Sequence, residues 1–322
     1  MDTVLVTGAC GLIGQHVCSG LLKKEHRVIA VDAQPGTYND GKANYTFIEA
    51  AQTDKAKYAE IFENNKIDAV VHLACTVDND FGHIITEKEM AMAKTCDKFM
   101  YRFAFAAGIK KIVSVSTSQV YKLPDSREPL REDDEIKPIT NYAVMKLAGE
   151  QEFADELRKQ KEAICCICRV APVYTKNFYE NLLSKITDPK DGSNFVYGTG
   201  QYGFQFCCVH NLVDFILCFV KNADDPSYTG IYNISDKHLA TASDIITYMK
   251  TNHRLGPVVQ KSSLKNPVSG ISTIIKKISG GNKDEKTNYR YLDWETFLYN
   301  NMLDNNKASK LLTFRWDIKN TK

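Results

Sequence analysis

Three glycines occur at fixed spacing near the start of the chain, in the stretch TGACGLIG from Thr7 to Gly14. The residues before it, 3–6, are β-branched or apolar, which favours a strand buried on both faces of a parallel sheet. The apolar residues after it recur at helical spacing. A buried strand that passes through glycines directly into a helix predicts the first unit of a doubly wound α/β fold.

Each glycine meets a different requirement of such a turn. Gly8 permits the tight turn, Gly11 lets backbone N–H groups approach a pyrophosphate, and Gly14 lets the helix pack closely on the strand. The positive end of the helix dipole then faces the phosphates. Glycines also fill ordinary turns, so the prediction of a nucleotide site depends on the strand and the helix on either side.

A second expected strand, 27–31, ends in Asp32, about twenty residues after the glycines. A carboxylate there accepts hydrogen bonds from a ribose diol and repels a 2′-phosphate. Ala33 and Gln34 follow, and neither offers a positive charge to that phosphate. The sequence therefore predicts NAD rather than NADP, with the alternative that Asp32 only caps the next turn.

Composition and length narrow the class of protein. A chain of 322 residues is long enough for roughly two domains, and 43% hydrophobic with 25% charged residues is typical of a globular protein. The net charge of +2 offers no electrostatic surface for nucleic acid. No stretch approaches the roughly 20 apolar residues that span a bilayer, and the chain begins with a strand rather than a secretory signal. We expect a cytoplasmic protein with neither a nucleic-acid nor a membrane partner.

Ten cysteines raise the question of a metal site. Cys165, Cys166 and Cys168 alternate with isoleucines in an apolar run, and Cys207 and Cys208 are adjacent. Neither group has the C-x-x-C spacing of a zinc site, and no histidine pair follows at ligand spacing. We expect reduced thiols that act as small buried hydrophobes, and no metal.

Strand-like and helix-like segments alternate through the first half of the chain, which predicts right-handed crossovers and a doubly wound parallel (Rossmann) sheet. After the first two strands, the expected strands are 44–48, 68–74 and 110–116, and the expected helices are 54–64, 87–107 and 141–160. Beyond Val170 the pattern loosens, with Gly and Pro around 189–203 and a polar stretch near 279–286.

Two constellations carry the chemistry. In VSTSQVY, 115–121, hydroxyl groups follow a parallel strand at its C-terminal end, where ligands bind in open α/β sheets. Tyr142 and Lys146 lie four residues apart on one helix face. A phenol with an ordinary pKa near 10 is a weak base at neutral pH unless a neighbouring ammonium favours the phenolate. The alternative is a surface pair on a structural helix.

These motifs together resemble the extended short-chain dehydrogenase/reductase superfamily, and within it the NAD-dependent epimerase/dehydratase family. TGACGLIG matches the family's Thr-Gly-x-x-Gly-x-x-Gly turn, STSQVY its Ser-Ser/Thr-x-x-Val-Tyr segment and YAVMK its Tyr-x-x-x-Lys. The resemblance is strong up to about Tyr174 and weaker beyond it. There RVAPVY resembles an Arg-x-x-x-Val-Tyr stretch, VHNLVDFI a strand before a late helix, and GIYNIS the last strand.

The resemblance implies a role for several residues. Thr117 would orient the substrate hydroxyl with Ser116 and Ser118 in support, Tyr142 would move its proton, and Lys146 would bind the ribose and lower the Tyr142 pKa. The implied cofactor contacts are Gly8, Cys10, Gly11, Leu12, Ile13, Gly14, Asp32, Leu73, Ala74, Cys75, Tyr142, Lys146, Pro172 and Val173.

The resemblance also implies the organisation of the chain. An NAD-binding domain would span 1–174, with 204–234 returning to it. A smaller C-terminal substrate-binding subdomain would contain 175–203 and 235–322. The helices 87–107 and 142–161 occupy the places that form a four-helix interface in the family, so we expect a homodimer.

Two of the four departures from the family bear on the substrate. Ser118 and Gln119 stand where a dehydratase carries Asp-Glu, which argues against water elimination. Gly203, Phe204 and Gln205 stand where nucleotide-sugar enzymes place an arginine for the diphosphate. Lysines elsewhere offer a replacement for that charge, namely Lys176, Lys185 and Lys190.

The other two departures concern the cofactor side. Ala51 replaces an adenine-side aspartate, and Ala93 falls near the asparagine of a proton relay. Three functions therefore remain open. The first is an NAD-dependent epimerase of a sugar or nucleotide sugar. The second is a net dehydrogenase or reductase of a sugar, steroid-like or other secondary alcohol, and the third is a non-catalytic NAD-binding sensor.

Overall fold

The structure is a computed structural model. It describes residues 1–36, 41–75, 85–122, 128–138, 140–188, 191–261 and 302–321. Lys190 and the polar stretch 279–286 lie outside these residues.

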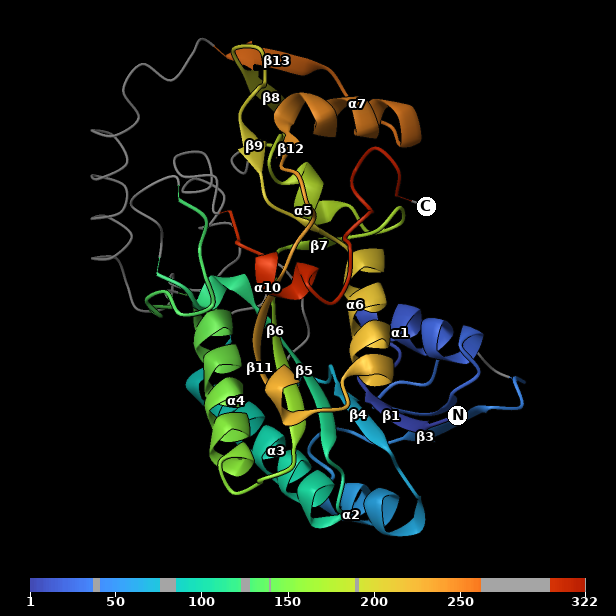
Figure 1. The fold of residues 1–322 in the computed structure, drawn as a ribbon. Helices are drawn as coiled ribbons and strands as arrows, with labels where there is room; N and C mark the ends of the chain where they lie inside the picture. Colours follow the sequence, from blue (N-terminus) through green and yellow to red (C-terminus); the bar gives the residue numbers. More distant parts are fainter. Residues whose placement is uncertain are drawn as a thin grey trace.

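A seven-stranded parallel sheet forms the centre of the larger part of the molecule (Figure 1). Its strands follow the order β11-β6-β5-β4-β1-β2-β3, so the strand order reverses between β1 and β4. The strands are β1 (Thr3–Thr7), β2 (Arg27–Asp32), β3 (Tyr45–Glu49), β4 (Ala69–His72), β5 (Lys111–Thr117), β6 (Ile164–Val170) and β11 (Gly230–Ile234). This confirms the doubly wound fold, in which ligands bind beside such a reversal at the carboxyl ends of the strands.

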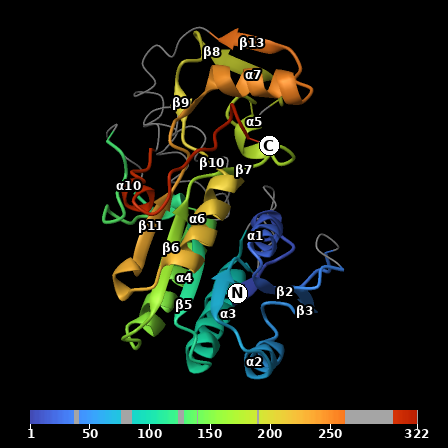
Figure 2. The ribbon, with the colours of Figure 1, turned by 45° about the vertical axis from the view of Figure 1, so that its right-hand side comes forward.

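Helices cover both faces of the sheet (Figures 1 and 2). On one face α1 and α6 pack into a core with the small and β-branched residues of the strands. On the other face α2, α3 and α4 form a second core rich in aromatic rings. The helices are α1 (Leu12–Lys23), α2 (Lys55–Asn64), α3 (Glu87–Ala106), α4 (Asn141–Leu157) and α6 (Val209–Asn222).

One sequence expectation is wrong. The segment VHNLVDFI, expected as a strand, forms the first turns of α6. The buried face of α6 contains residues spaced by 3, 4 and 7 positions, namely Leu212, Phe215, Ile216 and Phe219. The continuous apolar run in the sequence hid this helical period. The strand is only the two residues before the helix, β10 (Cys207–Cys208).

Smaller elements gather beyond the C-terminal edge of the sheet (Figure 2). Three two-stranded sheets pair β10 with β7, β9 with β12 and β8 with β13. The elements are β7 (Val173–Tyr174), α5 (Glu180–Leu183), β8 (Asn194–Tyr197), β9 (Gly203–Phe204), β12 (Ala240–Thr241), α7 (Ala242–Asn252), β13 (Val258–Lys261) and α10 (Asn306–Ser309), with 3-10 turns η1 (Ser118–Val120) and η2 (Pro226–Tyr228).

The closing segment of the chain packs on both parts. Leu303, Ala308 and Phe314 join the core beside α1 and α6, whereas Ile318 joins the core of the smaller elements. The division into an NAD-binding domain and a substrate-binding subdomain stays a prediction.

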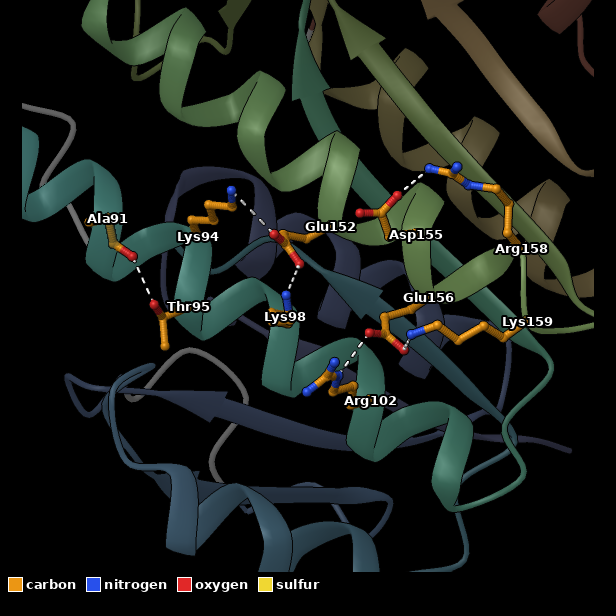
Figure 3. A network of polar contacts seen from close by, with 10 residues as sticks. All are labelled: Ala91, Lys94, Thr95, Lys98, Arg102, Glu152, Asp155, Glu156, Arg158 and Lys159. Atoms are coloured by element: carbon orange, nitrogen blue, oxygen red, sulfur yellow. Dashed lines mark hydrogen bonds and ion pairs between the residues drawn. The ribbon is translucent and has the colours of Figure 1, made fainter.

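Ion pairs link α3 to α4 on the side away from the sheet (Figure 3). The carboxylate of Glu152 lies 3.5 Å from the Lys94 ammonium and 2.9 Å from that of Lys98. Glu156 accepts a hydrogen bond of 2.8 Å from Arg102. Both carboxylates are buried while their partners are largely exposed, so the α3 cations cover the α4 anions and fix the two helices side by side.

All ten cysteines are free thiols, and seven are buried, including those of the alternating run in β6. Burial raises the pKa of the Cys165 thiol to about 12. Among the described residues, no three His, Cys, Asp or Glu side chains are placed to hold a metal ion. The same residues contain no helix with the length and apolar character needed to cross a bilayer.

Asp236 follows β11 and joins it to three neighbouring elements. Its carboxyl accepts hydrogen bonds from the Tyr174 hydroxyl (2.9 Å), the Cys208 backbone N–H (2.7 Å) and the Asn211 amide (2.8 Å). Burial raises the pKa of Asp236 to about 7, against the opposing effect of these hydrogen bonds.

The raised pKa of Asp236 predicts a pH-dependent stability. Between about pH 4 and about pH 7 the folded protein holds a proton on Asp236 that the unfolded chain has lost, so this group's contribution falls as pH rises through that window. Asp236→Asn keeps the size of the side chain and removes the titration. Urea unfolding across the window should give a smaller loss of stability with rising pH in the variant, and parallel curves would contradict the assignment.

The packing of α1 predicts a second effect on stability. A Cβ at Gly14 would overlap the Gly8 carbonyl oxygen and lie 2.7 Å from the Ala9 Cα, both backbone atoms. At Gly20, in the same helix, the nearest atoms belong to the movable side chains of Leu217 and Val213. Gly14→Ala should therefore cost about 1–3 kcal/mol or more in urea unfolding, and Gly20→Ala should change stability less. Equal losses would contradict the backbone contact.

Candidate functional site

The glycine turn lies between β1 and α1, at the carboxyl edge of the sheet. Gly8 has φ +68, and a Cβ there would lie 2.7 Å from the Ala74 nitrogen, so the turn requires glycine for its backbone and for its space. The helix begins at Leu12, and no side chain caps it at Gly11. The backbone N–H groups in the first turn of α1, around Ile13, have no side-chain cap and can therefore bind an anion.

Asp32 stands at the end of β2, beside this turn. One carboxylate oxygen accepts a 2.9 Å hydrogen bond from the Cys10 N–H, and the other accepts a 3.2 Å bond from the Gln34 N–H. These bonds orient the carboxylate and leave lone pairs on both oxygens for further donors. Ala51 is exposed one strand further on, just past the end of β3, where a methyl group offers no hydrogen bond.

The end of β4 lies against the glycine turn. Leu73 donates its backbone N–H to the Thr7 carbonyl at 3.1 Å, and Leu73 and Ala74 both direct their N–H groups to the Thr7 hydroxyl at 3.3 Å. Cys75 follows and is exposed. The structure thus places 73–75 at the same edge as the glycine turn, as the sequence predicts.

The hydroxyl-rich segment lies where β5 ends. Thr117 is the last residue of β5, and its hydroxyl accepts a 3.3 Å hydrogen bond from the Gln119 N–H. Ser118 and Gln119 form a 3-10 turn rather than an acid–base pair. Ser116 points away from this role, because its hydroxyl donates to the buried carboxylate of Glu150 at 2.5 Å.

Tyr142 and Lys146 lie on the first turns of α4, whose start is capped by the Thr140 hydroxyl. Tyr142 packs against a small apolar cluster that contains Ala93 and Met145. The alanine at the relay position therefore belongs to the apolar cluster against which the tyrosine packs.

Lys146 is influenced both by Tyr142 on α4 and by Cys75, which follows β4. Burial disfavours its charge, but the electrostatic effects of Tyr142, Cys75, Asp97 and Glu150 outweigh burial and raise the pKa of Lys146 above its ordinary value. The ammonium is therefore retained at neutral pH beside the phenol, which is the condition for a lowered phenol pKa.

Pro172 and Val173 follow β6 at the same edge. The Pro172 carbonyl accepts a 3.0 Å hydrogen bond from the Cys207 N–H, and Val173 pairs with Cys207. Three residues before Pro172, within β6, Arg169 forms a buried ion pair with Glu150 at 2.8 Å. The same carboxylate thus anchors α4 to β5 and β6.

The region expected to hold a diphosphate is apolar in part. Phe204 is buried, and the Gln205 amide donates to the Asp236 carbonyl at 2.9 Å. Of the candidate lysines, Lys176 is exposed and Lys185 is buried with its ammonium 5.9 Å from the Phe204 ring centre.

Sequence reasoning missed a polar chain that runs behind these residues. His72, at the end of β4, contacts Thr7 and Asp97, and Asp97 also accepts a hydrogen bond from Gln52. His72 directly precedes the 73–75 segment, but no local pattern pointed to its partners, Asp97 on α3 and Thr7 at the end of β1.

Comparison with known proteins identifies relatives of this chain. The family model described as the NAD dependent epimerase/dehydratase family matches residues 4–235. A UDP-glucose 4-epimerase of Bacillus subtilis is 27% identical over 169 residues, 47% of this chain and 47% of that protein. A dTDP-D-glucose 4,6-dehydratase of Dictyostelium discoideum is 24% identical over 264 residues, 73% of this chain and 58% of that protein. The matched segments thus span about half the length of these curated relatives.

Solved structures share the fold. The UDP-glucose 4-epimerase of Thermotoga maritima, solved with UDP-glucose, has a TM-score of 0.66 at 22% identity and covers 96% of this chain and 91% of its own. The UDP-glucuronic acid 4-epimerase of Bacillus cereus, solved with UDP-glucuronic acid and NAD, has a TM-score of 0.69 at 20% identity, with 97% and 93% coverage. Because the family model spans more than half of the 322 residues, the chain belongs to the NAD-dependent epimerase/dehydratase family.

Proposed function

We propose that the protein is an NAD-dependent epimerase of a nucleotide sugar. The observation that carries this proposal is the setting of Lys146, which lies one helical turn after Tyr142 on α4 and whose charged form is favoured by Tyr142 and by Cys75, after the end of β4. This brings a proton-transfer group to the edge of the sheet where the glycine turn lies. Curated relatives and solved neighbours that act on UDP-sugars support the choice of substrate class.

The residues of the turn fit NAD. Gly8 and Gly14 let the turn approach the end of β4 and the start of α1 in backbone contact, and no side chain caps the start of α1. Asp32 is oriented by Cys10 and Gln34 with lone pairs free for the ribose hydroxyls. NAD, when bound, supplies the hydride acceptor and donor.

Three residues of this chain would transfer the proton, bind the ribose and position the substrate. Tyr142 would take the proton from the sugar hydroxyl as that carbon is oxidised, and would return it when the carbon is reduced from the other face. Lys146 would hold the ribose and favour the phenolate of Tyr142. Thr117, fixed by its bond with Gln119, would hold the reacting oxygen.

Epimerisation is preferred over dehydration for a structural reason. Water elimination needs an acid and a base beside the sugar, and Ser118 and Gln119 supply a hydroxyl and an amide in a 3-10 turn instead. Net dehydrogenation of a less charged alcohol is the second candidate, favoured by buried Phe204 where an arginine would bind a diphosphate. Release of free NADH during turnover distinguishes it from epimerisation.

A homodimer through α3 and α4 and a cytoplasmic location stay predictions. The exposed apolar side chains Met92 on α3 and Val144 on α4 support the dimer.

Tyr142→Phe tests the catalytic assignment. The variant keeps the ring and loses the hydroxyl, so NAD affinity should be retained while interconversion of UDP-glucose and its 4-epimer falls by about 10²–10⁴-fold. Lys146→Met should weaken both NAD binding and turnover. Thr117→Ser should be mild and Thr117→Val severe, because only valine removes the hydroxyl. Near-parental turnover of Tyr142→Phe would exclude this role, and NAD binding without turnover in the parent would favour a sensor.

Cofactor choice gives a separate prediction. Asp32→Ala combined with Ala33→Arg removes a repelling carboxylate and supplies a partner for a 2′-phosphate, so calorimetry should show preference moving from NAD toward NADP. Ala33→Arg alone keeps the carboxylate and is the matched control. Tighter binding of NADP than NAD by the parent protein would overturn the role of Asp32.

A further inference from the structure

A buried series of hydrogen-bonded side chains connects β1, β4, α3 and the loop after β3. The Gln52 amide donates to one oxygen of Asp97 at 2.8 Å, and the same oxygen lies 3.0 Å from Nε2 of His72. On the other side of the imidazole, Nδ1 lies 2.7 Å from the Thr7 hydroxyl. The His72 side chain is 3% exposed and that of Asp97 is 14% exposed, so these groups are shielded from water.

The direction of each hydrogen bond follows from the acceptor at Asp97. Its oxygen accepts from the Gln52 amide, and it accepts the ring proton on Nε2 of His72 as well. Nδ1 is then the acceptor toward the Thr7 hydroxyl. That hydroxyl also receives the Ala74 N–H and, in part, the Leu73 N–H, whose shorter bond is to the Thr7 carbonyl. The carboxylate therefore selects the tautomer with its proton on Nε2.

This series of hydrogen bonds ends at Leu73 and Ala74, whose backbone lies against the glycine turn. Leu73 and Ala74 are the residues that a Cβ on Gly8 would overlap. Asp97 is therefore connected to the glycine turn by two successive hydrogen bonds, one from Asp97 to His72 and one from His72 to Thr7.

The second oxygen of Asp97 faces α4. A Cβ on Gly149 would overlap it, so the absence of a side chain at Gly149 lets the carboxylate approach the helix that carries Lys146. Asp97 is also among the groups whose charge acts on Lys146, together with Glu150. The Asp97 carboxylate thus lies against α4, which carries Lys146, and also contacts His72 at the end of β4.

We propose that Asp97 is a positioning residue, which fixes the His72 tautomer and through Thr7 holds the 73–75 segment against the glycine turn in the geometry that binds NAD. The inference rests on the proposed function only for the identity of the bound cofactor. A carboxylate shielded from water costs free energy unless donors compensate it, and here the donors are the Gln52 amide and the His72 ring.

The tautomer is measured directly in cofactor-free protein labelled with 15N-histidine. Two-bond proton–nitrogen correlation spectra should show His72 with a proton on Nε2 and an unprotonated Nδ1. Asp97→Leu removes the acceptor and should give a mixture of tautomers, whereas Asp97→Asn keeps an oxygen acceptor and should preserve the parental pattern. Gln52→Leu is the matched control, since it removes the other donor to the same oxygen and should leave the tautomer unchanged.

Calorimetry with NAD supplies the second readout. Asp97→Leu should weaken NAD binding by about tenfold, as expected for the loss of one hydrogen bond to a charged group, and Asp97→Asn should restore most of it. A purely structural role predicts equal losses of thermal stability in Asp97→Leu and Gln52→Leu with the tautomer unchanged in both.

Two results would overturn the proposal. One is a parental His72 protonated on Nδ1, and the other is an Asp97→Leu protein with parental tautomer and parental NAD affinity. Neither result depends on sugar turnover, so a failure of the epimerase assignment leaves this test intact. If no variant or parent binds NAD, the cofactor assignment fails while the tautomer measurement still decides the role of Asp97 toward His72.

Discussion

The fold of the site depends on a contact between backbones. Gly8, Gly14 and the end of β4 approach so closely that side chains at the two glycines would displace main-chain atoms. The approach places the start of α1 beside the reversal in strand order between β1 and β4. The polar groups of the site, from Asp32 to Lys146, are arranged around this contact, and their positions follow from it.

The larger part of the fold could be predicted from sequence because its signals are local. The alternation of buried strands with helices gave the parallel sheet, and the spacing of Tyr142 and Lys146 gave one face of α4. The error at 209–216 arose from the same cause, since a short apolar run does not distinguish strand from helix until its period is counted over two turns.

The polar chain behind the site could not be predicted in this way. Its links join residues 25, 45 and 65 positions apart in the sequence, and none of them forms a spacing that a motif records. Asp97 looks like any polar residue of an amphipathic helix until the packing of α3 against α4 and β4 is known. Local patterns thus identify the groups that act on a substrate more readily than those that hold them in place.

The chain passes between the seven-stranded sheet and the smaller sheets more than once. It leaves after β6, returns in α6 and β11, leaves again through β12, and comes back in the segment 302–314. Several peptide connections therefore act together as a broad joint rather than a single hinge. We expect any opening between the two parts to be a small rotation about the line of these connections, two of which are tied together by the pairing of β7 with β10.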